Sequence, residues 1–161
     1  MNPDFPRVRR PTTRGGVCAL AAVVTLALGL PAPASADVAF SGGWMRPAHA
    51  GDKTAEAYVD VDPGDSPMVL VGVTTPLAKS VELVAGEVRD KTYRTHTVRR
   101  FELPAGSIFR FARYGNVLRL HDIVSDTHTG DSVHLEFTLR DPQGRSHSAG
   151  ADIVVRGLTL P

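Results

Sequence analysis

Cysteine is almost absent from this chain of 161 residues, which contains only Cys18. Cys18 lies at the start of the apolar run formed by residues 17–30, whereas a lipid-anchored cysteine would follow such a run. We therefore interpret Cys18 as part of a segment that is removed on export. The exported protein would then have no thiol, which excludes a disulfide framework, a thiolate metal site and a cysteine nucleophile.

The sequence also lacks an apolar run long enough to cross a membrane. Residues 17–30 fall short of the roughly 20 residues that a bilayer core requires. Arginines precede this run, and the small residues Ala34, Ser35 and Ala36 follow it. This order is typical of a secretory signal, so we predict a cleavable signal peptide at residues 1–36 and a single domain at residues 37–161. The protein is therefore expected to be secreted or extracytoplasmic, with an uncleaved anchor as the alternative.

The export route is less clearly marked in the sequence than export itself. Arg9 and Arg10 form the pair that a twin-arginine signal requires, but residues 11–13 (PTT) continue that pattern poorly. The general secretory route is therefore favoured.

No strong charge of either sign is present. The whole chain has a formal net charge of +1. Residues 1–36 contain four of its 18 basic residues and one of its 17 acidic residues, so the remaining 14 and 16 leave a net charge of about −2. This balance argues against a nucleic-acid partner.

Helical periodicity is missing from the region after residue 36. The apolar residues instead alternate over short runs, most clearly at Val133, Leu135, Phe137 and Leu139. Gly and Pro turn signals separate these runs. The pattern predicts an all-β fold, an antiparallel sandwich of about seven to nine strands. The expected strands are residues 57–61, 68–73, 81–84, 107–111, 117–120, 133–139 and 153–155.

Sequence motifs for catalysis are lacking as well. The chain has no G-x-S-x-G nucleophile motif, and Gly42-Gly43 is not followed by the Lys-Ser/Thr of a phosphate-binding loop. The neighbouring Asp60 and Asp62 are interpreted as a solvated strand edge. We therefore expect that the protein is not an enzyme.

Several segments in a fixed order nevertheless resemble the PCu(A)C family of periplasmic and secreted copper chaperones. The most specific are residues 70–83 (LVGVTTPLAKSVEL) and 103–107 (LPAGS), and the resemblance extends from about Phe40 to Val155. It implies a cupredoxin-like Greek-key β-sandwich that binds Cu(I) and delivers it to copper enzymes, notably cytochrome oxidase.

The resemblance also implies a copper site of two His and two Met, and this sequence departs from it. The family spacing places those ligands at Val84, Thr95, Val117 and Arg119, none of which offers an imidazole or a thioether. Arg119 would also bring a fixed positive charge to the position of the Cu⁺ ion. The family's usual copper site is therefore predicted to be absent.

His121 is the best remaining candidate for a metal ligand. It follows Arg119 by two residues, so in a strand the two side chains share a face. His96 is the second candidate, although it adjoins Thr95 and alternation would turn it to the other face. Asp122 and Asp126 could add carboxylates, which would favour Zn²⁺ or Cu²⁺. The alternative is that all these histidines are ordinary solvated residues.

Two functional hypotheses follow. The first is copper binding or delivery in the cell envelope by a monomer with a degenerate metal site and a copper-enzyme partner such as cytochrome oxidase. The second is a β-sandwich interaction module without a metal, which binds a partner protein or an anionic envelope polymer. The basic and aromatic residues of positions 89–113 are the candidate surface for the second hypothesis.

Overall fold

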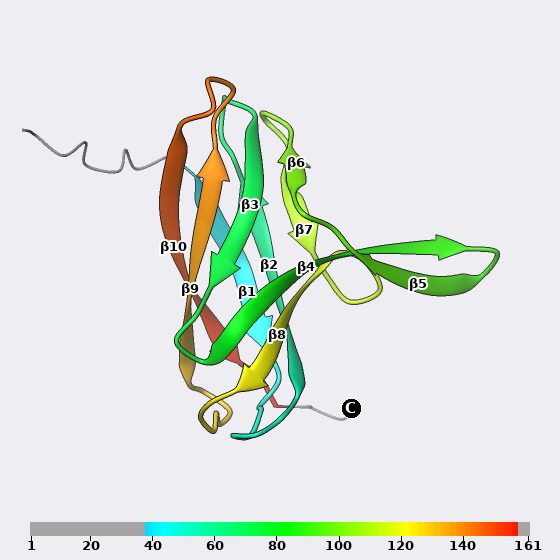
Figure 1. Ribbon diagram of the computed structural model, residues 1–161, viewed down its shortest axis with the longest axis vertical. Helices are drawn as coiled ribbons and strands as arrows, with labels where there is room; N and C mark the ends of the chain where they lie inside the picture. The colour runs from blue at the N-terminus through cyan, green and yellow to red at the C-terminus, as the bar shows by residue number, and fades with distance from the viewer. Residues whose placement is uncertain (1–37, 158–161) are drawn as a thin grey trace, which may run out of the picture. The chain divides into compact units, whose positions relative to one another are not determined.

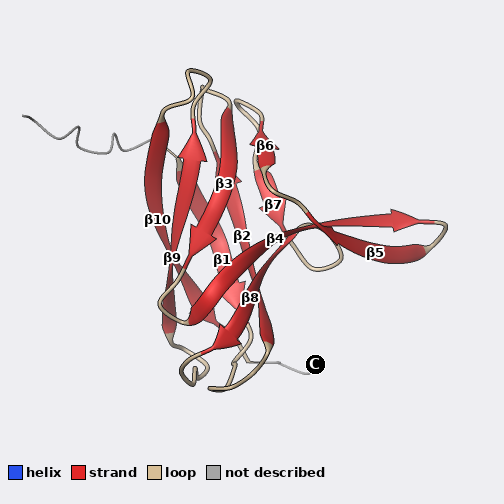
Figure 2. Ribbon diagram, in the orientation of Figure 1, coloured by secondary structure: helices blue, strands red, loops and turns tan. Residues whose placement is uncertain are grey.

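The computed structural model describes residues 38–157, and these residues form ten strands and no helix (Figures 1 and 2). The signal peptide expected at residues 1–36 and the lone Cys18 lie outside the described residues. The strands are β1 (Ala39–Met45), β2 (Thr54–Asp62), β3 (Met68–Thr74), β4 (Ala78–Arg89), β5 (Thr92–Thr97), β6 (Phe101–Leu103), β7 (Phe109–Phe111), β8 (Val117–Ile123), β9 (Ser132–Arg140) and β10 (Ser146–Val155).

Hydrogen bonds join these strands in the order β5-β4-β8-β2-β1-β10-β9-β3-β6, and β7 pairs with β2. All pairs are antiparallel except β1 with β10, which run parallel. The core cluster draws residues from β2, β4 and β8 and also from β3, β9 and β10, so the sheet folds over itself around one apolar interior. The predicted all-β sandwich is confirmed, with ten strands in place of about seven to nine.

The main core follows from the alternation seen in the sequence. Val133, Leu135, Phe137 and Leu139 of β9 are all buried and point into this interior. On β4 and β8, which pair directly, Leu83 and Leu118 do the same. Burial of these side chains supplies most of the stabilisation, at about 1.5–3 kcal/mol for each large apolar residue.

Strand β5 was not predicted, because almost all of its residues face water. Its sequence TYRTHT has only Tyr93 partly buried, so it has no apolar alternation. It forms because a two-residue turn, Asp90-Lys91, folds it back on β4. Both residues have positive φ, 51° and 60°, the signature of a type I′ hairpin turn.

The end of β4 and strand β5 form a two-stranded hairpin that projects from the sandwich (Figure 1). We call residues 85–97 the β4–β5 arm. Its free side makes β5 an edge strand of the sheet. The side chains near its tip are exposed, including Val88 at 66%. The arm therefore offers solvent-accessible surface that the core does not use.

No helix in the described part of the chain is both long and apolar enough to cross a membrane.

Candidate functional site

The four positions expected to hold copper lie on one face of the sheet. Val84 of β4 pairs directly with Val117 of β8, and Arg119 pairs with Glu82. Thr95 of β5 pairs with Gly86, two residues beyond Val84. Since directly paired residues share a face and alternate residues along a strand return to it, all four positions lie on the outer face, opposite the main core.

The two valine positions are buried beneath aromatic rings. Val84 and Val117 are 0% and 1% exposed and form a small second cluster with Tyr58 and Trp44. The rings of Trp44 and Tyr58 lie 4.5 Å apart, centroid to centroid. Where the family would place imidazoles, this chain has a closed apolar cluster.

Arg119 lies between two carboxylates. Its guanidinium nitrogens are 3.5 Å from an oxygen of Glu56 and 3.7 Å from an oxygen of Glu82. The other oxygen of Glu56 accepts a hydrogen bond from the Tyr58 hydroxyl at 2.9 Å. We call this arrangement the Glu56–Arg119–Glu82 network. It satisfies the arginine with two anions and places a positive charge where a Cu⁺ ion would have to bind.

Glu82 is the most connected member of the network. It accepts a hydrogen bond from the Thr97 hydroxyl and lies 3.1 Å from Nε2 of His121. These two contacts, with the nearby Arg119, lower the pKa of the Glu82 carboxyl. In contrast, burial and the hydrogen bond to Glu56 raise the pKa of Tyr58 to about 12. Glu82 is therefore held ionised and Tyr58 neutral at physiological pH.

The two histidines proposed as ligands are not brought together. His121 lies on the outer face beside Glu82, and its side chain is 36% exposed. His96 pairs with Ala85, which places it on the opposite face of the β4–β5 arm. Glu82, which sequence reasoning did not single out, is the carboxylate that His121 contacts within the described part of the chain. The available sequence signal was its position two residues before Val84, because alternate residues of a strand share a face.

The other histidines each have a carboxylate of their own. His134 lies 2.8 Å from Asp152, a hydrogen bond that raises the pKa of His134. The remaining pairs are His49 with Asp126, His128 with Asp131, and His147 with Asp141. Within residues 38–157, no three His, Cys, Asp or Glu side chains are grouped so that they could hold a metal ion. The residues present therefore do not fit the family's four-ligand Cu(I) site.

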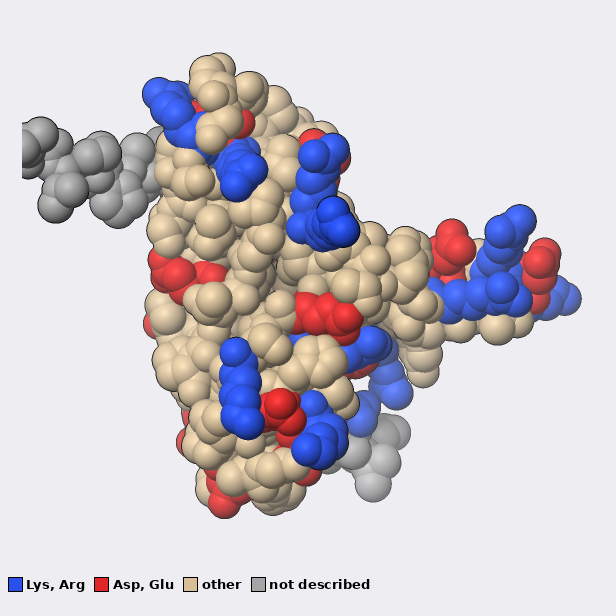
Figure 3. All heavy atoms as spheres, in the orientation of Figure 1, with Lys and Arg blue, Asp and Glu red and all other residues tan. Residues whose placement is uncertain are grey.

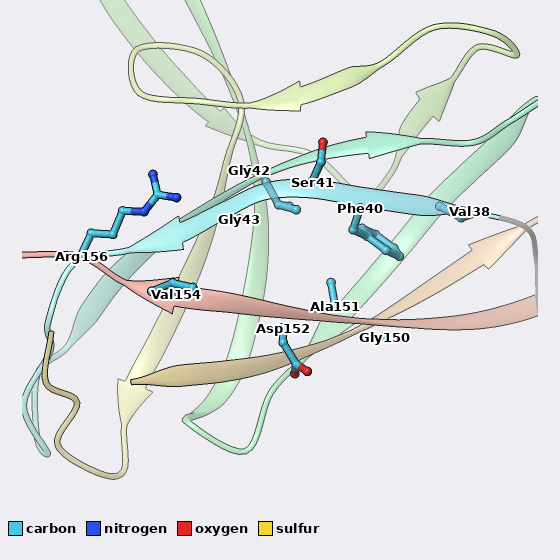
Figure 4. Close-up of a pocket in the computed structure, with 11 residues that line it drawn as sticks. Val38, Phe40, Ser41, Gly42, Gly43, Gly150, Ala151, Asp152, Val154 and Arg156 are labelled. Atoms are coloured by element: carbon cyan, nitrogen blue, oxygen red, sulfur yellow. The ribbon is translucent and has the colours of Figure 1, made fainter. Parts of the chain in front are cut away.

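A separate cavity of about 560 Å³ lies between β1 and β10 (Figure 4). These strands pair only at Trp44–Val154 and Met45–Val155, which lie at their C-terminal ends. Toward their N-terminal ends the two strands diverge. Phe40, glycine backbone and the charged Asp152 and Arg156 line the opening. It contains no histidine or methionine, so it is not a soft-metal site.

Solved structures share this fold. The copper-bound PCuAC domain from PmoF2 has a TM-score of 0.59 and 20% identity, over 78% of this chain and 97% of that chain. The solution structure of apo-DR1885 from Deinococcus radiodurans has a TM-score of 0.55 and 20% identity, over 99% and 98%. The protein is thus an all-β domain with the PCuAC fold.

The family assignment comes from sequence. The family model described as lipoprotein LpqE-like matches residues 38–149, which is more than two-thirds of the chain. The chain belongs to the LpqE-like family. No curated protein sequence matches it significantly.

Replacing Arg119 with methionine should lower the free energy of unfolding by about 1–2 kcal/mol, because Glu56 and Glu82 would lose the cation between them while partly buried. Urea denaturation measures the change. Arg100→Met is the matched control, since the Arg100–Glu102 pair is 68% exposed on both sides and should contribute little. An Arg119→Met variant as stable as the wild type would show that the network does not hold this face together.

Proposed function

We propose that this protein serves copper handling outside the cytosol as a non-enzymatic accessory, and that it acts through contact with a protein partner. One observation carries the proposal. The four positions of the copper site converge on one face, as expected for a chaperone scaffold, yet they hold Val84, Thr95, Val117 and an arginine fixed between two carboxylates.

The chemistry of that face supports partner contact over ion carriage. Cu(I) prefers thioether and imidazole ligands, and this face offers neither at the four positions. The link to copper is supported by the segments that resemble the copper chaperones and by the fold shared with a copper-bound PCuAC domain. An extracytoplasmic location is supported by the signal-like residues 1–36 and by a family description that names a lipoprotein.

One prediction of this proposal concerns the affinity of the protein for Cu(I). In competition with a chromophoric Cu(I) chelator, the wild type should not bind one tight equivalent of copper. The combined variant V84H/T95M/V117H/R119M restores both imidazoles and both thioethers and should take copper from the chelator. Arg119→Met alone is the control, because it removes the charge without adding the imidazoles.

Because Val84 and Val117 are fully buried, the combined variant needs a check of its fold by circular dichroism. The variant T95M/R119M leaves both valines intact and should gain weaker copper binding with His121. Tight one-to-one binding by the wild type would overturn the assignment of the four positions.

A further prediction concerns the copper enzyme that the protein would serve. In the organism that encodes the protein, deleting its gene should lower cytochrome oxidase activity under copper limitation, and added copper should restore it. A copy encoding His121→Ala should also restore it, because the proposed role does not require that imidazole. Unchanged oxidase activity would contradict a role in copper handling and leave the interaction module without metal as the function.

His121 and Glu82 carry a second, weaker candidate function, which is binding of Cu²⁺ or Zn²⁺. An imidazole and a carboxylate 3.1 Å apart supply two of the donors that such ions accept. Isothermal titration with each ion should give heats that His121→Ala abolishes and that His96→Ala leaves unchanged. Identical heats for the wild type and His121→Ala would exclude His121 as a ligand.

A further inference from the structure

The tyrosines and the tryptophan of this chain lie in one region outside the main core, where Tyr58 is buried and Tyr114 is largely exposed. The chain has only three tyrosines and one tryptophan. Trp44 and Tyr58 pack together on the outer face with their ring planes tilted by 36°. Tyr93 of the β4–β5 arm meets Tyr114 edge to face, with ring centroids 5.7 Å apart. The described phenylalanines instead belong to the main core or pack against it. Amphipathic aromatic residues are therefore concentrated at one place, away from the main core.

Loop contacts join the two aromatic pairs. The loop of residues 112–116 connects β7 to β8 and lies against the base of the arm (Figure 1). The Tyr93 hydroxyl donates a hydrogen bond to the carbonyl oxygen of Gly115 at 2.9 Å. From the same loop, the Arg113 guanidinium lies 5.1 Å from the centre of the Tyr114 ring. Arg113 also lines a cavity of about 350 Å³ together with Tyr58 and Arg46. We call this cavity, with the adjoining Tyr93 and Tyr114, the aromatic crevice.

The aromatic crevice contains both basic and acidic side chains. Arg46 and Arg113 form no ion pair within the described residues, whereas nearby Arg110 and Arg119 are paired with carboxylates. Two carboxylates also line the cavity. Glu56 is held by Arg119 and Tyr58, whereas Asp52 accepts only a backbone hydrogen bond from His49 and keeps its charge. Among the described residues, the lining therefore has two arginines without an ion pair and one such carboxylate. Basic side chains are also visible below the base of the arm in Figure 3.

Two large side chains at or beside the crevice are strongly exposed to solvent. Tyr114 is 64% exposed and Val88, on the same face of the arm as Tyr93, is 66% exposed. Exposed Tyr, Trp and Arg side chains are the residues most enriched among the energetic centres of protein interfaces. These exposed side chains lie near Thr95, one of the four positions of the family spacing.

The geometry points to the aromatic crevice as a docking site for an acidic segment of a partner protein. The carboxylates of that segment pair with Arg46 and Arg113, while its apolar side chains cover Tyr114 and Val88. This inference rests on the partner contact in the proposed function and names the surface that makes it. A protein segment suits the crevice better than an anionic polymer, because two arginines set among aromatic rings match mixed acidic and apolar side chains and not an extended row of charge.

A random peptide library displayed on phage tests the site with a defined probe. Selection against the exported protein should enrich peptides rich in Asp and Glu that also carry an apolar or aromatic residue. Arg113→Ala and Tyr114→Ala should each weaken binding of the enriched peptides about tenfold or more. Higher ionic strength should weaken it as well. The matched control is Arg140→Ala, an exposed position on β9, which should leave binding unchanged.

Three outcomes would overturn the inference. They are enrichment of neutral or basic peptides, enrichment of no peptide, and equal binding by Arg113→Ala and the wild type. Retention on heparin that depends on Arg113, without selection of acidic peptides, would assign the crevice to an anionic polymer and also overturn it. The oxidase measurement is independent of this one. An oxidase defect without acidic peptide binding would refute the docking site alone, and acidic peptide binding without an oxidase defect would refute the copper role alone.

Discussion

The register between β4 and β8 is the constraint on which the outer face depends. Leu83 opposite Leu118 and Val81 opposite Leu120 face the core, and their burial selects this register. A slip of one residue would turn these side chains to the outside. With the register set, Glu82 must lie opposite Arg119 and Val84 opposite Val117. The chemistry of the outer face is thus fixed by packing on the other side of the same strands.

That coupling explains how the fold is kept with no imidazole or thioether at the four positions of the family spacing. A metal site stabilises a fold only when the ion is bound, because the free energy of ion binding is what adds to the free energy of folding. Here the same positions stabilise the sandwich without an ion, through buried valines under Tyr58 and Trp44 and through an arginine held by two carboxylates. Fold alone therefore does not determine what such a domain binds.

The parts that sequence could predict are those with strong alternation. The run from Val133 to Leu139 specified a strand with one buried face, and the structure has that face in the core. Strand β5 escaped prediction because its side chains face water and a turn without glycine at Asp90-Lys91 creates it. The family spacing predicted four positions around Val84, which the structure places on one face, but the partners of Arg119 could not be foreseen. Glu56 lies on β2, and only the pairing of β2 with β8 brings it opposite Arg119.

The aromatic crevice could not be predicted from the sequence either, and its contacts suggest what the arm does. Tyr58 and Arg113 line the same cavity although they are far apart in sequence, so no local pattern could place them together. Their meeting requires β2 to pair with β7 and β8, and Tyr93 adjoins them because the arm folds beside the loop of residues 112–116. Gly86 permits that approach, because a Cβ there would lie 2.2 Å from the Gly115 carbonyl oxygen. The same hairpin that carries Thr95, one of the four copper-site positions, therefore holds Tyr93 in the crevice. The arm can take part in the proposed docking although Thr95 offers no thioether, because its contact with the loop depends on the Tyr93 hydroxyl and on the close approach of Gly86 to Gly115.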